Sequence, residues 1–533
     1  MTRQIGIGID SGTSGTKACA YGEDGKLIVA SDVFGGYPIL GDGIGSSEQE
    51  LAAIKQAVFA ALRDLTGRLS VLGYVSADLL AGAMAATFQM HTSVPLDENY
   101  QPVRDRVILW NNAVGGEFVK QMIFHFGLSE VIKLTNNHPT TGYSLIHTLL
   151  VKHTLDQAWQ KARRVGLLNS LFGYWLTGRH VLNWNDAAGT IAFDVANNRW
   201  SPEIADWAKV PAEFWPDVIA PDGLVGEIRG IFEETGIPDG MRLYGGLGDC
   251  AAGALGCGVV TPGQACAILG TAGIFVVPTA NLIVDEQGGG RVQSYNYVAG
   301  RSHLLSTNLS AGACFEQFRR LLLRLKPGEV LSDEELNRRL SFAALDAEAL
   351  AVPFGNDALL IDTRIAGERT GMPGWKPNAR GNWLGLTPTT TAAEVYLAMM
   401  KGVVFNQMMH AAICTDLGVA MNDITLMGGG TKSPFYAGLL AAGMKAVNPE
   451  AKVRILGAGQ GGGARGMALL ALKGAGVITD LAAVAADVER GEALVTTHPT
   501  QGLDMTPEMS AQYQRWIGRC YNPVVKVVDH DIF

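Results

Sequence analysis

The sequence predicts an α/β protein of two domains, and three observations support this prediction. The chain has 533 residues, 47% of them hydrophobic, whereas a single hydrophobic core seldom organises more than about 250–300 residues. Short apolar runs alternate with helical patterns along the chain, which is typical of an α/β fold. Three of these runs end in a glycine-rich turn that carries hydroxyl side chains.

The predicted strands are short apolar runs, each followed by turn residues. They lie at residues 5–9, 107–110, 265–269 and 424–427. Helical spacing of the i, i+3, i+4, i+7 kind occurs between them, as in Val395, Ala398, Met399 and Gly402. No low-complexity linker marks a domain boundary, so we place it in the turn-rich stretch 245–261. The predicted domains are residues 1–250 and 251–533.

Charge and cysteine content exclude several classes of function. A formal net charge of −9 opposes binding to nucleic acid or to an anionic membrane surface. The seven cysteines are odd in number and include no C-x-x-C pair, so neither a disulfide framework nor a zinc site is indicated. The first residues show no basic-then-apolar leader. We therefore expect a cytoplasmic protein with reduced thiols.

One long stretch, residues 251–284, contains no charged side chain and is the segment to test as a membrane span. Prolines, amides and six glycines divide it into pieces of strand length. We therefore predict buried sheet strands here, and no membrane span.

The first glycine-rich turn has the sequence DSGTSGTK at residues 10–17. Glycines let backbone N–H groups approach an anion, hydroxyls and Lys17 add donors, and Asp10 could hold a magnesium ion through water. An ordinary hairpin turn explains the same residues when the motif is taken alone.

Two further turns of this kind follow later strands, GTAG at 270–273 and GGGT at 428–431. A nucleoside triphosphate needs several separate patches of donors, so three such turns together indicate nucleotide binding. The P-loop motif G-x-x-x-x-G-K-[ST] is absent from the sequence, which disfavours a P-loop ATPase.

A rival motif, GAGQGG at residues 457–462, matches the dinucleotide fingerprint G-x-G-x-x-G. It follows the apolar run 453–456, and Asp480 stands near the position of the expected acidic residue. Little second strand can form between the motif and Asp480, however. A dinucleotide-binding oxidoreductase is therefore the weaker alternative.

Asp249 ends the sequence GGLGD at residues 245–249 and is a candidate catalytic base. Phosphoryl transfer to a hydroxyl requires a group that accepts the proton of the attacking alcohol. An aspartate that caps the helix expected at 251–255 is the competing interpretation.

Beyond these patterns, the chain resembles the FGGY carbohydrate kinase family over nearly its full length, and within it the xylulose kinases. Several separated motifs carry the resemblance in the family's order. They are IDSGTSG at 9–15, QMH at 89–91, LWN at 109–111, DAAGT at 186–190, GD at 248–249 with AAG at 251–253, GT at 270–271, GERT at 367–370 and GGG at 428–430.

The resemblance implies two actin-like (ribonuclease H-like) ATPase domains, with an interdomain cleft that uses ATP and Mg²⁺. Asp249 would be the general base and Asp10 the magnesium-linked carboxylate. The implied phosphate and nucleotide contacts are Thr13, Ser14, Lys17, Thr271, Gly312, Gly429 and Ser433. The implied sugar contacts are Gln89, Met90, His91, Trp110 and Asp249. Without the family context, His91 and Trp110 would be interpreted as ordinary packed side chains.

Four departures from the family pattern concern the substrate more than the reaction. Cys250 follows the base where xylulose kinases carry asparagine, and Asn112 stands where they carry aspartate. The stretch 147–151 lacks the lysine and tryptophan of the first family signature, and Lys401 ends the second. Cys250 and Asn112 flank the expected sugar site, so the sequence leaves open which hydroxyl groups of the substrate are recognised there.

The resulting hypothesis is an ATP-dependent kinase of a small sugar, with D-xylulose as first choice. A kinase of gluconate, ribulose, erythritol or another polyol or sugar acid is the alternative, followed by the oxidoreductase and by a non-catalytic nucleotide-binding protein. The expected partners are the sugar and ATP, without nucleic acid or membrane, and a homodimer is a candidate assembly.

Overall fold

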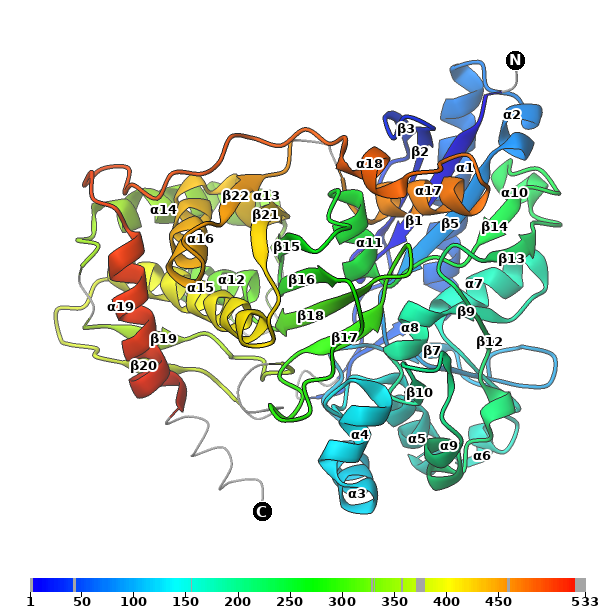
Figure 1. Cartoon of the computed structure of the whole chain (residues 1–533), viewed down its shortest axis with the longest axis horizontal. Coiled ribbons are helices and arrows are strands. Elements are labelled where there is room, and N and C mark those ends of the chain that lie inside the picture. The colour runs from blue at the N-terminus through cyan, green and yellow to red at the C-terminus, as the bar shows by residue number, and fades with distance from the viewer. Residues whose placement is uncertain are drawn as a thin grey trace. The chain divides into compact units, whose positions relative to one another are not determined.

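The computed structural model describes residues 3–41, 45–154, 156–326, 329, 331–355, 358–370, 379–457 and 461–522. The chain forms two compact units (Figure 1). The first consists of Met1–Thr261, Pro278–His303 and Ala458–Val488, and the second of Pro262–Val277, Leu304–Gly457 and Glu489–Phe533. Both units are discontinuous in sequence. The linear division at residue 250 stays a prediction.

The first sheet has the strand order β13-β14-β5-β1-β2-β3. Its strands are β13 (Leu224–Glu227), β14 (Arg242–Tyr244), β5 (Ala83–Phe88), β1 (Ile5–Ser11), β2 (Thr16–Gly22) and β3 (Leu27–Ala30). Strand β1 pairs antiparallel with β2 and parallel with β5, and β5 pairs parallel with β14.

The second sheet has the order β17-β18-β16-β15-β21-β22. Its strands are β17 (Gln293–Asn296), β18 (Ser302–Asn308), β16 (Gly273–Thr279), β15 (Gly263–Leu269), β21 (Met421–Met427) and β22 (Lys452–Ile455). Strand β15 pairs antiparallel with β16 and parallel with β21, which pairs parallel with β22. The two sheets thus share one pairing pattern, in which a glycine-rich turn follows the central strand.

Each unit also contains helices. In the first unit they are α1 (Leu51–Val71), α2 (Ser76–Ala81), α3 (Gly116–Phe126), α4 (Leu128–Thr135), α5 (Ser144–Thr154), α6 (Asp156–Trp159), α7 (Leu168–Thr177), α8 (Trp184–Ala188), α9 (Pro202–Ala208), α10 (Phe232–Thr235), α11 (Asp249–Gly256), α17 (Gly463–Gly474) and α18 (Leu481–Ala486). In the second they are α12 (Gly312–Leu322), α13 (Asp333–Arg339), α14 (Phe342–Ala351), α15 (Ala392–Asp416), α16 (Pro434–Val447) and α19 (Thr506–Trp516).

Short two-stranded pairs complete the fold. They are β4 (Glu48–Glu50) with β7 (Arg106–Ile108), β6 (Val94–Leu96) with β8 (Arg164–Gly166), β9 (Val181–Asn183) with β12 (Asp217–Ile219), β10 (Phe193–Asp194) with β11 (Arg199–Trp200), and β19 (Leu360–Asp362) with β20 (Asn382–Leu384).

Strand β1 shows how the first unit is packed. Its isoleucines at 5, 7 and 9 are buried in one core with α1, because alternate residues of a strand face opposite sides of the sheet. Gly6 and Gly8 face α17, which lies alongside β1 and β5 (Figure 1). A Cβ on Gly8 would lie 1.7 Å from the carbonyl oxygen of Ala464, so only glycine permits this approach.

The predicted strands at 5–9, 265–269 and 424–427 are confirmed as parts of β1, β15 and β21, and the run at 107–110 overlaps β7. The uncharged stretch 251–284 does contain the whole of β15 and β16, but its first residues form helix α11, so the all-strand prediction was wrong there. Among the described residues, no helix is long and apolar enough to cross a membrane.

The dinucleotide interpretation of residues 457–462 is not supported by the fold. Residues 458–460 of the motif lie outside the described residues, but its flanking elements are described. Strand β22 pairs in the second sheet, whereas the following helix, α17, packs on β1 and α11 in the first unit, so the two do not form a βαβ unit on one sheet. Asp480 caps helix α18 by accepting a hydrogen bond from the Ala483 N–H.

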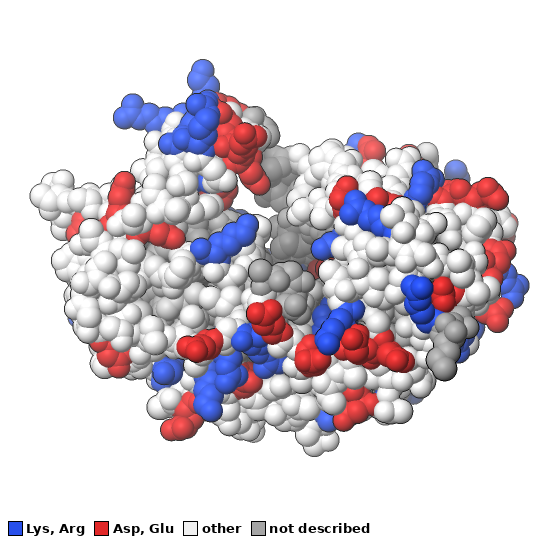
Figure 2. All heavy atoms as spheres, turned by 90° about the horizontal axis from the view of Figure 1, so that it is seen from above, with Lys and Arg blue, Asp and Glu red and all other residues white. Residues whose placement is uncertain are grey.

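The surface carries mixed charge. Acidic and basic side chains are interspersed on the face shown in Figure 2. None of the seven cysteines, all of which lie in the described part of the chain, is part of a disulfide.

Candidate active site

Asp249 is the first residue of helix α11, directly after the cap residue Gly248. The interpretation of Asp249 as the cap itself is therefore wrong. Its carboxylate accepts a hydrogen bond of 2.8 Å from the Cys250 N–H, and the Gly248 N–H donates to Asn185 Oδ1 at 3.0 Å. Burial raises the pKa of Asp249 to about 7, the hydrogen bonds from Cys250 oppose this rise, and the charges of Asp10 and Asp186 add to it.

Asp10 lies near the end of β1, paired in register with Lys17 on β2. Burial raises the pKa of Asp10 to about 6, while a hydrogen bond from the Gly463 N–H and the charge of Lys17 oppose the rise. Gly463 begins α17, and a Cβ there would lie 2.6 Å from Asp10 Oδ2. Glycine therefore lets the amino end of α17 reach this carboxylate.

Asp186 is a third carboxylate of the same electrostatic group, and sequence reasoning quoted its motif without assigning it a role. It accepts hydrogen bonds from Asn183 Nδ2 at 2.7 Å and from Asn169 Nδ2 at 2.9 Å. Burial raises the pKa of Asp186 to about 6, and these two amides limit the rise. Since its charge also raises the pKa of Asp249, Asp186 helps to set the proton affinity of the candidate base.

The turn after β1 joins the predicted phosphate and sugar residues into one network. Trp110 Nε1 donates to Thr13 Oγ1 at 3.0 Å, and that hydroxyl donates to Gln89 Oε1 at 3.0 Å. Gln89 Nε2 donates in turn to Gln49 Oε1 at 2.7 Å, and Gln49 Nε2 donates to the Thr13 carbonyl at 2.8 Å. Gln49, on β4, is fully buried and was missed, because no motif surrounds it in the sequence.

The other two predicted phosphate residues of this turn, Ser14 and Lys17, are exposed. The turn is a hairpin, closed by the Gly12 N–H donating to the Gly15 carbonyl at 3.0 Å. Buried Thr16 lies within hydrogen-bond distance of the Ser11 hydroxyl (2.8 Å) and of the Tyr37 hydroxyl (3.1 Å). These contacts fix the turn while its exposed donors face solvent.

Met90 packs against the start of α11, whereas His91 packs against Gly189, the cap residue that ends α8. A Cβ on Gly248 would lie 2.4 Å from Met90 Sδ, so the glycine before the candidate base makes room for this methionine. His91 has a left-handed backbone (φ 66°), which is rare for a residue other than glycine. Its Nδ1 lies 2.6 Å from the Gly189 carbonyl oxygen, which can only accept, so Nδ1 carries the proton. The ring packs edge-on against Tyr143, with centroids 5.0 Å apart.

The two departures near this region differ in their surroundings. Asn112 is buried, and its Nδ2 donates to the Val114 carbonyl at 2.9 Å. Cys250 is half-buried, and its thiol forms a hydrogen bond with the Asp249 carboxylate that lowers the pKa of Asp249. Cys250 is therefore the departure that acts on the candidate base.

The second unit contains a pocket of about 840 Å³, which is within the usual size range of small-molecule sites. The four nucleotide residues implied for this unit, Thr271, Gly312, Gly429 and Ser433, all line it. The Gly312 N–H donates to the Gly270 carbonyl at 3.0 Å, which ties the amino end of α12 to the glycine turn. A Cβ on Gly312 would lie 2.7 Å from that oxygen.

Further residues that line this pocket come from α12–α15 and were not found from the sequence. Arg319 donates to Asn337 Oδ1 at 2.8 Å, and its guanidinium lies 4.3 Å from the centroid of the Phe342 ring. Asp346 accepts a hydrogen bond of 3.2 Å from the Tyr396 hydroxyl, and burial raises its pKa. No turn motif marks these residues, since they lie within helices.

Two compact α/β units, a cluster of carboxylates with raised pKa values in one and a nucleotide-sized pocket in the other define a candidate phosphotransferase. Family models agree. The N-terminal domain model of the FGGY family of carbohydrate kinases matches residues 5–256, and the C-terminal domain model matches residues 265–475. The chain belongs to the FGGY family of carbohydrate kinases, and it is therefore an enzyme that phosphorylates a sugar with ATP.

Individual relatives are more distant. The chain is 27% identical to the xylulose kinase of Lactococcus lactis over 402 residues, which cover 75% of each protein. Its fold is similar to the crystal structures of gluconate kinase and of ligand-bound xylulose kinase from Lactobacillus acidophilus. The former has a TM-score of 0.82 and 20% identity, covering 99% of this chain and 98% of that one. The xylulose kinase structure has a TM-score of 0.81 and 21% identity, and the match covers 97% of this chain and 96% of that one. The predicted fold class is thus confirmed.

Proposed function

We propose that the enzyme transfers the γ-phosphate of ATP to a terminal hydroxyl of D-xylulose, with Asp249 as the general base. The observation that carries the proposal is the setting of Asp249. Its pKa of about 7 means that the carboxylate is both available and basic near neutral pH. Met90 packs against Gly248, the residue before Asp249, and xylulose kinases are among the relatives that match most of the chain.

In the proposed reaction, Asp249 accepts the proton of the sugar hydroxyl as its oxygen attacks the γ-phosphorus, and ADP leaves in line with the attack. Thr271, Gly312, Gly429 and Ser433 hold the nucleotide, while Thr13, Ser14 and Lys17 contact the phosphates. Gln89, Met90, His91 and Trp110 orient the sugar. Most of the rate enhancement then comes from positioning and from charge stabilisation.

A magnesium ion fits this scheme, with Asp10 as its protein ligand. Among the described residues there is no group of three or more His, Cys, Asp or Glu side chains that could hold a metal by itself. Magnesium commonly uses one or two carboxylates together with substrate phosphates and water, and Asp10 is a partly buried carboxylate beside Asp249. When bound, the ion would supply charge neutralisation on the phosphates.

Cys250 favours a second candidate, a kinase of a sugar acid or another polyol. A thiol is a weak hydrogen-bond partner, so a hydroxyl that an amide would bind could be left unpaired here. An unpaired buried hydroxyl costs about 1–3 kcal/mol, or roughly one to two orders of magnitude in preference. The gluconate kinase of similar fold shows that sugar acids occur as substrates on this scaffold.

The test is a comparison of kcat/KM for D-xylulose, L-xylulose, ribulose, gluconate, glycerol and erythritol, measured by coupled ADP release. We expect D-xylulose to rank first. If it ranks below a sugar acid or tetritol, and Cys250→Asn moves it upward, the enzyme is a sugar kinase whose substrate is not D-xylulose.

A further inference from the structure

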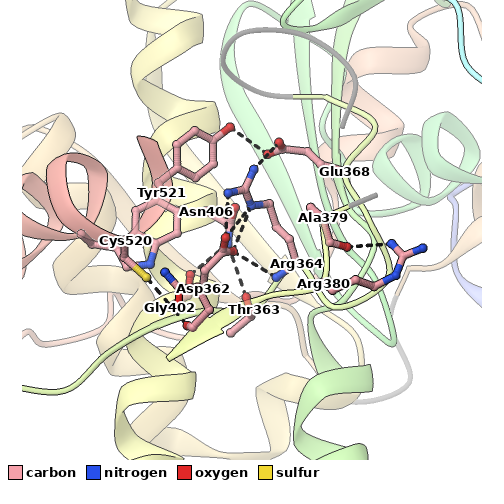
Figure 3. A network of polar contacts seen from close by, with 12 residues as sticks. Asp362, Thr363, Arg364, Glu368, Ala379, Arg380, Gly402, Asn406, Cys520 and Tyr521 are labelled. Carbon is pink, nitrogen blue, oxygen red and sulfur yellow. Dashed lines mark hydrogen bonds and ion pairs between the residues drawn. The ribbon is translucent and has the colours of Figure 1, made fainter. Parts of the chain in front are cut away.

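A buried cluster of charged side chains lies at the end of strand β19 in the second unit (Figure 3). Arg364 donates to both carboxylate oxygens of Asp362, at 2.9 Å from Nε and 2.7 Å from Nη2, and its Nη1 donates to Glu368 at 2.6 Å. The exposed fractions of the Arg364, Asp362 and Glu368 side chains are only 1%, 0% and 3%. One cation is thus shared between two carboxylates away from water.

The C-terminal part of the chain completes this cluster. Helix α19 continues into a π-helical turn, Ile517–Tyr521, and the Tyr521 hydroxyl donates to Glu368 Oε1 at 2.9 Å. The tyrosine ring lies over the Arg364 guanidinium, 3.8 Å from ring centroid to Cζ. Trp516 Nε1 also donates to the Ile361 carbonyl at 2.9 Å. The family's C-terminal model ends at residue 475, so these contacts belong to a segment to which it assigns nothing.

The segment that carries Arg364 and Glu368 is hydrogen-bonded to the residues that lead into the nucleotide pocket. Thr370, two residues after Glu368, accepts from the Thr307 N–H at 2.7 Å and donates to the Thr307 carbonyl at 3.2 Å. The Ala366 N–H donates to the Ser310 hydroxyl at 2.9 Å. Ser310 stands two residues before Gly312, which lines the pocket. The segment 364–370 therefore links the cluster to the turn that enters α12.

Burying these charges to join two segments carries a large desolvation cost. Desolvation of buried ions offsets much of their attraction, and well-packed apolar residues often stabilise a fold equally well. A buried arginine between two carboxylates fixes their geometry, because its planar guanidinium donates hydrogen bonds in only a narrow range of directions. A cluster of this kind specifies where the segment 364–370 lies.

We propose that the C-terminal segment 516–521 positions the nucleotide pocket through this cluster, with Tyr521, Glu368 and Arg364 as positioning residues. They hold the segment 364–370, which holds the turn 307–312 at the pocket wall. The nucleotide as ligand rests on the proposed function, whereas the mechanical link from Tyr521 to the turn 307–312 does not.

The test compares Tyr521→Phe with the wild-type chain. This change removes the hydroxyl bound to Glu368 and keeps the ring over Arg364. We expect the KM for ATP and the Kd for ADP to rise roughly 3- to 30-fold, with the KM for the sugar unchanged, because the predicted sugar residues belong to the first unit. Amide hydrogen exchange should become faster in residues 304–312.

Tyr513→Phe is the matched control. It removes a hydroxyl from the same C-terminal helix and keeps the ring that stacks on Trp516. We expect wild-type ADP affinity and wild-type exchange in this variant. Glu368→Gln is the second variant, and it also weakens the contact with Arg364. Because both variants weaken the Tyr521–Glu368 hydrogen bond, Tyr521→Phe should cost less in the Glu368→Gln background than in the wild type.

Unchanged ADP affinity and unchanged exchange at 304–312 in Tyr521→Phe would overturn the proposal. Faster exchange spread evenly over the second unit would also overturn it, because it would show a general structural role. If the wild-type chain bound no ADP, the proposed function would fail, and the exchange at 304–312 would still decide the positioning role.

Discussion

Asp249, Asp10 and Asp186 lie close enough that the charges of the other two raise the pKa of Asp249. Such a group is unfavourable for folding, because buried carboxylates of like charge resist ionisation. It suits a catalytic base, whose pKa should lie near the working pH. The residues that would do the chemistry are thus also a source of instability.

The pH dependence of kcat/KM follows from this environment. Only ionised Asp249 can accept a proton, so we expect activity to rise as the pH increases through about 7, the pKa of Asp249. Asp186→Asn removes a charge that raises this pKa, and it should move the midpoint of the profile to lower pH. A midpoint near 4 in the wild-type enzyme would contradict the assignment of the base.

Stability should depend on pH in the opposite sense. The pKa of Asp249 is about 7 in the folded chain against a model value of 3.8, so between these pH values the folded state binds more protons than the unfolded state. The free energy of unfolding therefore falls as the pH rises through this window. We expect Asp249→Asn to raise Tm more at pH 7.5 than at pH 4.5. An equal or smaller gain at pH 7.5 would show that the carboxylate is not strained.

At the residue scale, the sequence reached some of these groups and not others. Asp249 and Asp10 follow strands in glycine-rich turns, and this local pattern can be recognised in the sequence. Gln49 and Asp346 have no such signal, because what defines them is a partner at a distance in sequence: Gln89 for the first and Tyr396 for the second. Sequence patterns report local neighbours only.

At the scale of elements, glycines set how closely helices approach. Gly466 on α17 faces α11, and a Cβ there would lie 2.1 Å from the Ala252 carbonyl oxygen. The two helices therefore pack backbone to backbone, which positions the N-terminal end of α11 with Asp249 and that of α17 with Gly463.

Gly466→Ala tests this packing. The added methyl group would meet backbone that cannot move alone, so we expect a loss of about 1–3 kcal/mol or more in the free energy of unfolding, measured by urea denaturation. Gly67→Ala is the control, since Gly67 is an exposed residue of α1 with open space around its Cα. It should gain about 0.5–1 kcal/mol. A neutral Gly466→Ala would show that the helices are not in close contact.

Helices and strands were predicted correctly where the residue composition of a run favours the same structure that the fold gives it. The valine- and isoleucine-rich or glycine-spaced runs became strands at β1, β15 and β21. The prediction failed at 251–256, where AAGALG forms α11. This run lacks β-branched residues and is rich in alanine, a strong helix former, so the absence of charge alone was a poor guide to strand.

At the scale of the whole molecule, the compact units are discontinuous in sequence, and no linear pattern could have shown this. Helix α17, at residues 463–474, packs on β1, at residues 5–11, because Gly6 and Gly8 leave room for Ala464 and Ala468. Neither the sequence of α17 nor that of β1 indicates that the two pack together. Helix α17 belongs to the first unit although it follows most of the second unit in sequence.

Single-turnover transfer of phosphate from ATP to D-xylulose, followed for the wild-type enzyme and Asp249→Asn with ADP affinity measured in parallel, tests the proposed mechanism most directly. We expect D-xylulose phosphate from the wild type and a rate lower by about 10²–10⁴-fold in the variant. ADP affinity should be unchanged, because the predicted nucleotide residues of the second unit are untouched. A variant rate near that of the wild type, or a loss of ADP binding equal to the loss of rate, would contradict Asp249 as the base.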